Sequence, residues 1–349
     1  MKNKLFIFNL EMNTRSELLY HNYLWAKELS NEFTETTVIT HKNPVFMDKK
    51  DYSLFTMIIS LGNYKRFLQL IQLLVVACTI IKNRKNSVVF YHMAVYPASI
   101  LSPILSVFRV RQVLWYSHSH KSIPLHIASL FVNEIITPTP NSFPLNLTKV
   151  TSIGHGITFS EYLPALQLRT KSKILILGRI SKIKNIELLI QLVSQFNSFS
   201  NSIELDLFGP ILNKSYFDEL MNFAKDKNVV VNYNGSLKPI EVFEQISAYS
   251  IAYNGMVNSV DKSALEVTAQ GCLLISPFEE TLMLSGMKYV YPKPMNTKAQ
   301  LEYLLSLTES EMEVAQRTVM EESRRKNYYK NTILIIVSKL RGEKNTNVH

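Results

Sequence analysis

The stretch KILILGRISKIKN, residues 173–185, decides the fold class of this chain. It begins with an apolar run that is typical of a buried strand and continues into a short loop. A helical pattern follows at once, with Ile186 and Leu189 on one face. A strand, a short loop and a helix in this order present backbone N–H groups and the positive end of the helix to an anion. Arg179 and Lys184 add two cations to the same loop, so the stretch indicates an anion-binding site.

A second stretch of the same kind, NSVDKSALEVTAQG, occupies residues 258–271. Here a loop opens a helix that Gly271 ends, and an apolar strand at residues 272–275 follows. Two helix starts that suit an anion therefore lie in the same half of the chain. This arrangement predicts that a nucleotide diphosphate is held between them.

The composition limits the classes of partner. The chain has 349 residues, of which 46% are hydrophobic, and this suffices for the cores of two domains. The net charge of +10 and the pI of about 9.3 favour acidic partners, namely sugar nucleotides, anionic lipid surfaces or nucleic acid. Because the sequence has no Arg-rich arm and no long lysine tract, we expect no nucleic-acid partner.

The cysteines and the apolar segments bear on localisation. Cys78 and Cys272 stand in apolar sequence, which predicts reduced core residues of a cytoplasmic protein. The first ten residues hold too short an apolar run for a signal peptide and predict a strand. The apolar segment 67–81 is shorter than the ~20 residues that a bilayer crossing requires. It predicts either a helix packed on a sheet or, because Arg66 and Lys82 flank it, a helix in the membrane interface at the inner face of the plasma membrane.

Strand-like and helical patterns alternate along both halves of the chain. This alternation predicts an α/β fold with two doubly wound, Rossmann-like domains that face a cleft. The pattern stops in an irregular stretch after residue 157 and restarts at Lys173, which marks a domain boundary. We therefore expect domains at residues 1–165 and 166–325, and a C-terminal helix in residues 326–349. Ligands are expected at the carboxyl ends of the strands, in the cleft.

Four motifs in the second half resemble those of a known family. They are Gly178-Arg179-x4-Lys184, Phe208-Gly209-Pro210, Asn232-Tyr-Asn-Gly235-Ser236 and the helix that carries Glu266 before Gly271. In order and spacing they are similar to the large retaining family of GT-B glycosyltransferases, also called glycosyl transferases group 1 or glycosyltransferase family 4-like. The resemblance implies the GT-B fold, in which the C-terminal helix in residues 326–349 crosses back to the N-terminal domain. It also implies the transfer of a sugar, with retention, from a nucleotide-diphosphate sugar. The implied acceptor is a cell-envelope or lipid-linked saccharide.

The resemblance also implies which residues bind the donor. They are Arg179, Lys184, Gly209, Ser236, Asn258, Asp261, Lys262, Ser263 and Glu266. Departure of the diphosphate builds negative charge on its oxygens, and Arg179 and Lys184 are implied to stabilise that charge catalytically. Glu266 is implied to bind the ribose hydroxyls, although Ser263-x-x-Glu266 also fits a helix capping box. The N–H groups of residues 261–263 would face the diphosphate or the sugar.

The sequence departs from the family pattern at three places. Asn258 stands where relatives have a first glutamate that touches the transferred sugar, which bears on sugar identity and on activity itself. The first loop, residues 11–16, lacks the glycine-rich turn of many relatives, and Arg15 is expected to substitute for it in part on the acceptor side. Asn185 stands where glycine commonly follows the lysine, and asparagine tolerates the left-handed backbone expected there.

Two histidines follow a predicted strand at residues 113–117. By resemblance, His118 is the active-site histidine that contacts sugar hydroxyls between donor and acceptor. His120, two residues later, is the alternative, and we place it on the acceptor side. Without the resemblance, both would be interpreted as structural histidines at the end of a strand.

The motifs that are missing exclude several classes of enzyme. The sequence has no G-x-G-x-x-G after a strand, no P-loop, no H-E-x-x-H and no G-x-S-x-G. It also has no Asp-x-Asp, the motif that holds a divalent ion in GT-A glycosyltransferases, so we expect neither a metal nor another cofactor. Two alternatives to a transferase stay open. One is a non-catalytic GT-B-like partner subunit, and the other, less favoured, is a nucleotide-sugar epimerase.

Overall fold

The computed structural model describes residues 3–16, 19–62, 64–160, 166, 169–197, 203–237 and 239–343. Its contacts divide the chain into two compact units. Unit 1 consists of Met1–Gly156 together with Tyr329–His349, and unit 2 is Ile157–Tyr328. The boundaries expected from the sequence, 165/166 and 325/326, lie close to these divisions but not at them, and residue 165 lies outside the described residues.

Unit 1 is built on a parallel sheet. Its strands are β1 (Lys4–Asn9), β2 (Glu35–Thr40), β3 (Met57–Ser60), β4 (Ser87–His92), β5 (Arg111–Trp115), β6 (Glu134–Thr137) and β7 (Val150–Ser152). Their order across the seven-stranded sheet is β3-β2-β1-β4-β5-β6-β7, and every neighbouring pair is parallel. The order reverses between β1 and β4, which is the doubly wound arrangement.

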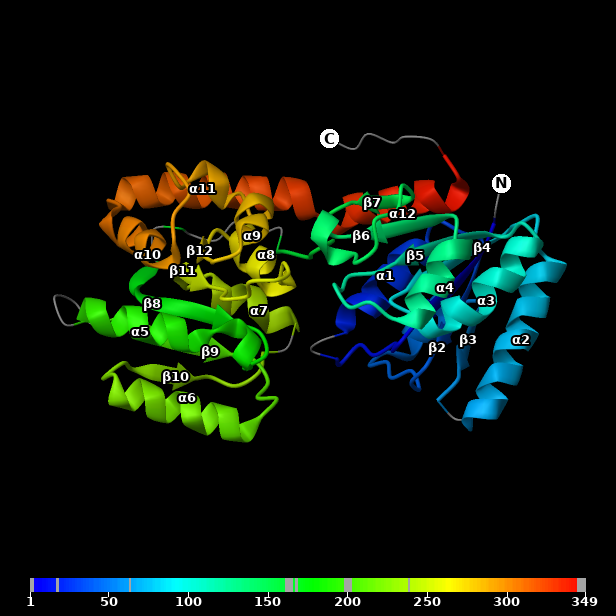
Figure 1. Cartoon of the computed structure of the whole chain (residues 1–349), viewed down its shortest axis with the longest axis horizontal. Coiled ribbons are helices and arrows are strands. Elements are labelled where there is room, and N and C mark those ends of the chain that lie inside the picture. The colour runs from blue at the N-terminus through cyan, green and yellow to red at the C-terminus, as the bar shows by residue number, and fades with distance from the viewer. Residues whose placement is uncertain are drawn as a thin grey trace. The chain divides into compact units, whose positions relative to one another are not determined.

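Helices cover both faces of this sheet (Figure 1). One face carries α2 (Arg66–Lys82), α3 (Val95–Val107) and α4 (Ile123–Phe131), which share a core with the sheet through Leu73, Leu101 and Leu125. The other face carries α1 (Tyr20–Ser30) and α12 (Tyr329–Arg341), which pack with β4 and β5 through Trp25 and Ile336. Short 3₁₀ helices η1 (Lys49–Leu54) and η2 (Pro140–Ser142) complete the described elements of this unit.

Unit 2 holds a five-stranded sheet of the same design. Its strands are β8 (Thr170–Leu177), β9 (Glu204–Phe208), β10 (Val231–Tyr233), β11 (Tyr249–Tyr253) and β12 (Leu273–Ile275), in the order β10-β9-β8-β11-β12, with parallel neighbours. The helices are α5 (Ile186–Asn197), α6 (Lys214–Asp226), α7 (Pro239–Ile246), α8 (Lys262–Ala269), α9 (Glu279–Leu284), α10 (Thr297–Ser306) and α11 (Glu309–Asn327), with 3₁₀ helices η4 (Lys182–Lys184) and η5 (Met287–Tyr289).

The strand order of unit 2 has its switch point between β8 and β11. The chain leaves β8 toward β9 on one side and later returns to β11 on the other side. In open α/β sheets, ligands bind outside the carboxyl ends of the strands at such a switch point. The two loops are residues 178–185 and 254–261, which are the loops of the two anion-binding stretches in the sequence.

Four expectations from the sequence need correction. The sequence has a continuous helical pattern over residues 311–339, which predicts one helix. The structure has two helices there, because Tyr328 adopts an extended backbone (φ −62°, ψ 123°) that ends α11 before α12 begins. Strand β5 begins and ends two residues earlier than residues 113–117, and the short, polar strand β7 was not predicted. Cys78 is exposed on α2, whereas Cys272 is buried as expected. Among the described residues, no helix has both the length and the apolar character that spanning a bilayer requires.

Candidate functional site

The site begins where the ends of β8 and β9 approach each other through two glycines. The Gly178 N–H donates to the Phe208 carbonyl, and the Gly209 N–H donates to the Gly235 carbonyl, each at 2.8 Å. A Cβ atom on Gly209, whose φ is +139°, would lie 2.1 Å from the Gly178 oxygen. Only glycine fits there. The structure thus gives Gly209 a backbone role, and its donor-binding role stays a prediction.

The loop after β8 is held in a tight turn. Asn185 has φ 46° and ψ 48°, so the prediction that it adopts a left-handed backbone is confirmed. The Tyr253 hydroxyl, at the end of β11, donates to the Asn185 carbonyl at 2.8 Å. A Cβ on Gly255 would lie 2.2 Å from the Lys184 carbonyl oxygen, so the two loops touch through their backbones. This contact fixes the direction in which the Lys184 side chain leaves the turn.

Lys184 points inward and is 3% exposed. Its Nζ donates to the Leu177 carbonyl at 3.3 Å and to the Ser263 hydroxyl at 3.2 Å, and it forms an ion pair with Asp261 Oδ2. Gly178 lies against the same cluster, because a Cβ there would meet Lys184 Nζ at 3.0 Å. The prediction that the two stretches converge is therefore confirmed. The charged partner of Lys184, however, is a carboxylate of the chain itself.

Asp261 occupies the N-terminus of α8. It is the N-cap residue, and its Oδ1 accepts the Ser263 N–H at 3.3 Å. Its Oδ2 accepts the Asn254 Nδ2 at 3.0 Å in addition to the Lys184 ammonium. The carboxylate thus takes the position at the helix end that an incoming anion would favour.

The capping box expected from Ser263-x-x-Glu266 is wrong. Because α8 begins at Lys262 and is capped by Asp261, Ser263 lies one residue inside the helix and Glu266 is too far along it to reach the cap. Glu266 instead pairs with Lys262, whose Nζ lies 3.7 Å from Glu266 Oε1. The carboxylate of Glu266 is half-buried and therefore keeps a surface for another donor.

Burial shifts the pKa values of two groups in this cluster. It lowers the pKa of the Lys184 amine, and the neighbouring Arg179 charge lowers it further, whereas Glu266 raises it and the Asp261 carboxylate also opposes the lowering. Burial raises the pKa of Glu266, and the ammonium groups of Lys262 and Lys184 oppose that rise. Shifted groups that converge at a topological switch point are typical of functional sites.

The remaining predicted donor residues are exposed or half-buried. Arg179 is exposed, and its side chain makes no hydrogen bond or ion pair with any other residue that the structure describes. Asn258 and Ser236 are exposed on the loops before α8 and after β10, and Lys262 is half-buried. Arg179 is therefore the cation of this cluster that a ligand can reach without displacing an internal partner.

In unit 1, Arg15, His118 and His120 lie in loops at the carboxyl ends of β1 and β5. All three are exposed. The His118 ring lies 6.1 Å from that of Tyr116, and the hydroxyl of Tyr116 donates to the His120 carbonyl at 2.7 Å. Both histidines are therefore presented by a braced loop at the sheet edge where ligands are expected. Their roles, and that of Arg15, stay predictions.

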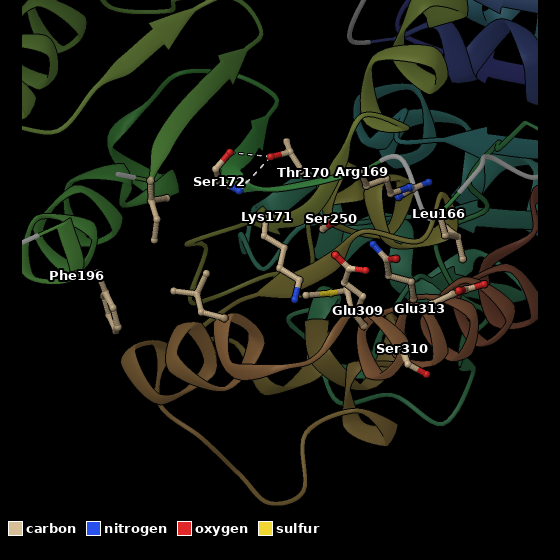
Figure 2. Close-up of a pocket in the computed structure, with 14 residues that line it drawn as sticks. Leu166, Arg169, Thr170, Lys171, Ser172, Phe196, Ser250, Glu309, Ser310 and Glu313 are labelled. Carbon is tan, nitrogen blue, oxygen red and sulfur yellow. Dashed lines mark hydrogen bonds between the residues drawn. The ribbon is translucent and has the colours of Figure 1, made fainter. Parts of the chain in front are cut away.

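Unit 2 also has a hollow that lies apart from this cluster. It encloses about 930 Å³ near the start of β8, between the end of α5 and the start of α11 (Figure 2). Figure 2 shows the Arg169 guanidinium directed away from Lys171 and Glu309. Arg169 donates to the Tyr249 and Gln270 carbonyls, and Lys171 donates to the Leu307 carbonyl. Both cations are thus engaged with backbone carbonyl groups. None of the predicted donor residues lines the hollow.

Sequence reasoning missed Asn254, which orients Asp261. Its side chain is 2% exposed and follows β11 directly. The available signal was a polar residue at the carboxyl end of a buried strand, where parallel strands deliver functional groups.

Among the described residues, no three His, Cys, Asp or Glu side chains group in a way that could hold a metal ion.

Comparisons with known proteins establish the fold. No protein-family model matches the chain, and no curated protein matches it by sequence. The HepE protein of Anabaena, solved with UDP and glucose, has a TM-score of 0.67 at 12% identity, covering 98% of this chain and 99% of that chain. A glycosyltransferase of Rickettsia africae has a TM-score of 0.72 at 10% identity, covering 98% and 100%. The lipopolysaccharide outer core galactosyltransferase WaaB has a TM-score of 0.64 at 12% identity, covering 97% and 100%. The predicted α/β fold of GT-B type is therefore confirmed.

Proposed function

We propose that this protein is a glycosyltransferase that moves a sugar, with retention and without a metal, from a nucleotide-diphosphate sugar to a saccharide acceptor. The observation that carries the proposal is the contact of Lys184 with the start of α8 at the β8–β11 switch point of a GT-B fold, with the Arg179 charge near Lys184. In this proposal the two cations and the helix N-terminus form an anion site once a phosphate takes the place of the Asp261 carboxylate beside Lys184. The HepE structures that contain UDP or UDP-glucose support a donor of that class.

The chemistry asks the protein to stabilise a leaving diphosphate. Cleavage of the bond between the anomeric carbon and the phosphate places negative charge on the phosphate oxygens. Cations held in a site that excludes water stabilise such charge far more than they would in bulk solvent. In this proposal Arg179 meets the diphosphate first, and Lys184 exchanges its contact with Asp261 for a phosphate oxygen. Glu266 accepts hydrogen bonds from the ribose hydroxyls, and His118 orients the transferred sugar.

The acceptor in this proposal is a cell-envelope or lipid-linked saccharide, and the protein works in the cytoplasm at the inner face of the membrane. Two structural neighbours bear on this choice. WaaB is named as a lipopolysaccharide outer core galactosyltransferase. TarM has a TM-score of 0.70 at 9% identity, and a mutant of S. aureus TarM, solved with fondaparinux, α-GlcNAc-glycerol and UDP, has a TM-score of 0.64 at 9% identity. The net charge of +10 is compatible with an anionic surface or substrate.

A turnover assay tests the proposal. Purified protein is incubated with UDP-, GDP- and ADP-sugars and a bacterial lipid-linked saccharide fraction, and release of the nucleoside diphosphate is followed with and without EDTA. We expect release from one donor, unchanged by EDTA, and a loss of at least about 100-fold in Arg179→Ala, as for a single preorganised donor to a developing charge. NMR of the anomeric proton in the product tests retention. Restoration by magnesium after loss in EDTA would contradict the metal-independent mechanism.

The alternative function is a non-catalytic subunit with the same fold that binds sugar or stabilises a transferase. Two observations favour it. Asn258 carries no charge where relatives have a glutamate, and Asp261 holds Lys184 in the position of a ligand anion. A protein that binds a nucleotide sugar without turning it over, with every acceptor fraction offered, would favour this alternative.

A further inference from the structure

Helix α2 presents an apolar face that the described structure leaves exposed. Phe67 is 72% exposed and Val75 is 53% exposed. The face comprises Phe67, Leu68, Ile71, Leu74 and Val75, which recur at intervals of three and four residues and therefore lie on one side of the helix. The opposite side, which includes Leu73 and Val76, is buried in the core of unit 1. An apolar stripe of this length on both sides of a helix exceeds what packing on a sheet requires.

The neighbouring helices extend this face. Helix α4 exposes Ile123 (78%) and Leu130 (73%), and the end of α3 exposes Val107 (78%). Helix α3 contacts both α2 and α4, and all three bury their inner sides in one core on the same face of the sheet (Figure 1). Their outer sides consequently look away from the sheet in the same direction. We call this the α2–α4 surface: Phe67, Leu68, Ile71, Leu74, Val75, Val107, Phe108, Ile123, Ile127, Leu130 and Phe131.

The segment that carries the α2–α4 surface has charges of one sign. Between Asp51 and Glu134 the sequence contains no acidic residue and eight basic ones. The basic residues are Lys65, Arg66, Lys82, Arg84, Lys85, Arg109, Arg111 and Lys121, and all except Arg111 are exposed. Much of the net charge of +10 is thus concentrated beside these helices, although no basic tract marks it in the sequence. A hollow of about 430 Å³ joins Arg84, Lys85 and Arg109 to Val107 and Phe108, so cations and apolar groups meet in one place.

We propose that the α2–α4 surface docks the protein on an anionic lipid bilayer. An aliphatic and aromatic centre with a basic rim is the pattern that inserts into the interface while its cations meet acidic headgroups. A nucleic-acid groove places its cations along the contact and not at the rim of an aliphatic patch. Helix α2 has 17 residues and is about 25 Å long, which is shorter than the ~30 Å hydrocarbon core, so it lies in the plane of the interface. This docking needs no nucleotide and is independent of the proposed transferase activity.

Vesicle binding tests the proposal. The full chain is sedimented with liposomes of pure phosphatidylcholine and of phosphatidylcholine with 30% phosphatidylglycerol, at low and high salt. We expect binding to the anionic vesicles, weaker binding at high salt, and little binding to the neutral ones. Each cation near an anionic surface contributes about fivefold, so Arg84→Gln, Lys85→Gln and Arg109→Gln together should lower the partition constant about 100-fold.

Two further variants distinguish the contribution of the apolar residues from a general effect of net charge. Leu74→Gln with Leu130→Gln should weaken binding at high salt as well as at low salt, because it removes inserted apolar area. A matched charge control, Lys214→Gln, Lys298→Gln and Arg317→Gln, removes three exposed cations of unit 2 and should bind as the native protein does. Circular dichroism and the melting temperature verify that each variant is folded. Absence of binding to anionic vesicles, or an equal loss in the charge control, would overturn the proposal.

Discussion

The ion pair between Lys184 and Asp261 should have opposite effects on nucleotide affinity and on the stability of the free protein. The Asp261 side chain is 21% exposed, that of Lys184 is 4% exposed, and the pair lies at the start of α8. If a diphosphate binds here, the Asp261 carboxylate repels it and holds the cation that it needs. Replacement of Asp261 by asparagine removes the charge but keeps an N-cap side chain, since asparagine caps helices as well as aspartate does.

The size of the effect follows from Coulomb's law. Two like charges about 6 Å apart, at an effective dielectric constant of about 20, repel each other by about 3 kcal/mol. Partial exposure reduces this, so we take about 2 kcal/mol, which corresponds to an affinity gain of about 30-fold. The stability of the unliganded protein should change in the opposite direction. Loss of the carboxylate leaves the buried Lys184 ammonium without its counter-ion, and the free energy of unfolding should fall by about 2 kcal/mol.

Isothermal titration calorimetry with the nucleoside diphosphate, beside thermal unfolding of the free protein, measures both effects for Asp261→Asn. Asp218→Asn is the matched control, because it removes an exposed carboxylate that pairs with Lys214 on α6 of the same unit. Tighter binding together with a lower melting temperature, and neither change in the control, is the predicted outcome. Weaker binding in Asp261→Asn would refute the reasoning, because Asp261 would then organise the phosphate site instead of competing for it.

Four other predictions concern the same site. Glu266→Gln should weaken nucleotide affinity about 10-fold through loss of charge-assisted bonds to the ribose. With a 2′-deoxy ligand, the native protein and the variant should differ much less in affinity, as measured by calorimetry. Asn258→Glu should raise kcat about 10-fold in the turnover assay by restoring a charge beside the sugar, with Asn258→Gln as the neutral control. Because the pKa of Lys184 is lowered, this side chain loses its charge at a lower pH than an ordinary lysine does. Nucleotide affinity should therefore fall as the pH rises through that lower range. Lys184→Arg should flatten this pH profile, because arginine stays charged. Gly209→Ala should cost about 3 kcal/mol or more of unfolding free energy in urea titration, because its Cβ would overlap the Gly178 oxygen.

The fold could be predicted from the sequence because its signals are local. Residues 174–177 are a continuous apolar run, as expected for a strand buried on both faces, and all four are buried in β8. The left-handed turn at Asn185 was also predictable, since few residues other than glycine tolerate it. The break at Tyr328 was not, because the helical pattern runs through it and the extended backbone there coincides with the division between the two units.

The site was predictable in its location but not in its internal contacts. Strand–loop–helix patterns predicted that the loops bearing Arg179 and Lys184 would meet the start of α8. The partner of Lys184 lies 77 residues away in the sequence, and no local pattern shows that Asp261 would turn its carboxylate toward the lysine. Cys78 was placed in the core because α2 is apolar on nearly every side, so periodicity did not distinguish its buried face from its exposed one.

The most direct test of the central claim is nucleotide binding at the β8–β11 switch point. Thermal unfolding is measured against UDP, GDP, ADP, CMP and their sugars for the native protein and for Arg179→Ala. Because Arg179 is exposed and has no partner among the described residues, its removal should leave the unliganded protein unchanged. Arg317→Ala, on the exposed side of α11, is the control. We predict that one nucleoside diphosphate raises the melting temperature of the native and control proteins, and that Arg179→Ala loses the shift. A flat response to every nucleotide at millimolar concentration, or a shift that Arg179→Ala retains, would contradict the account.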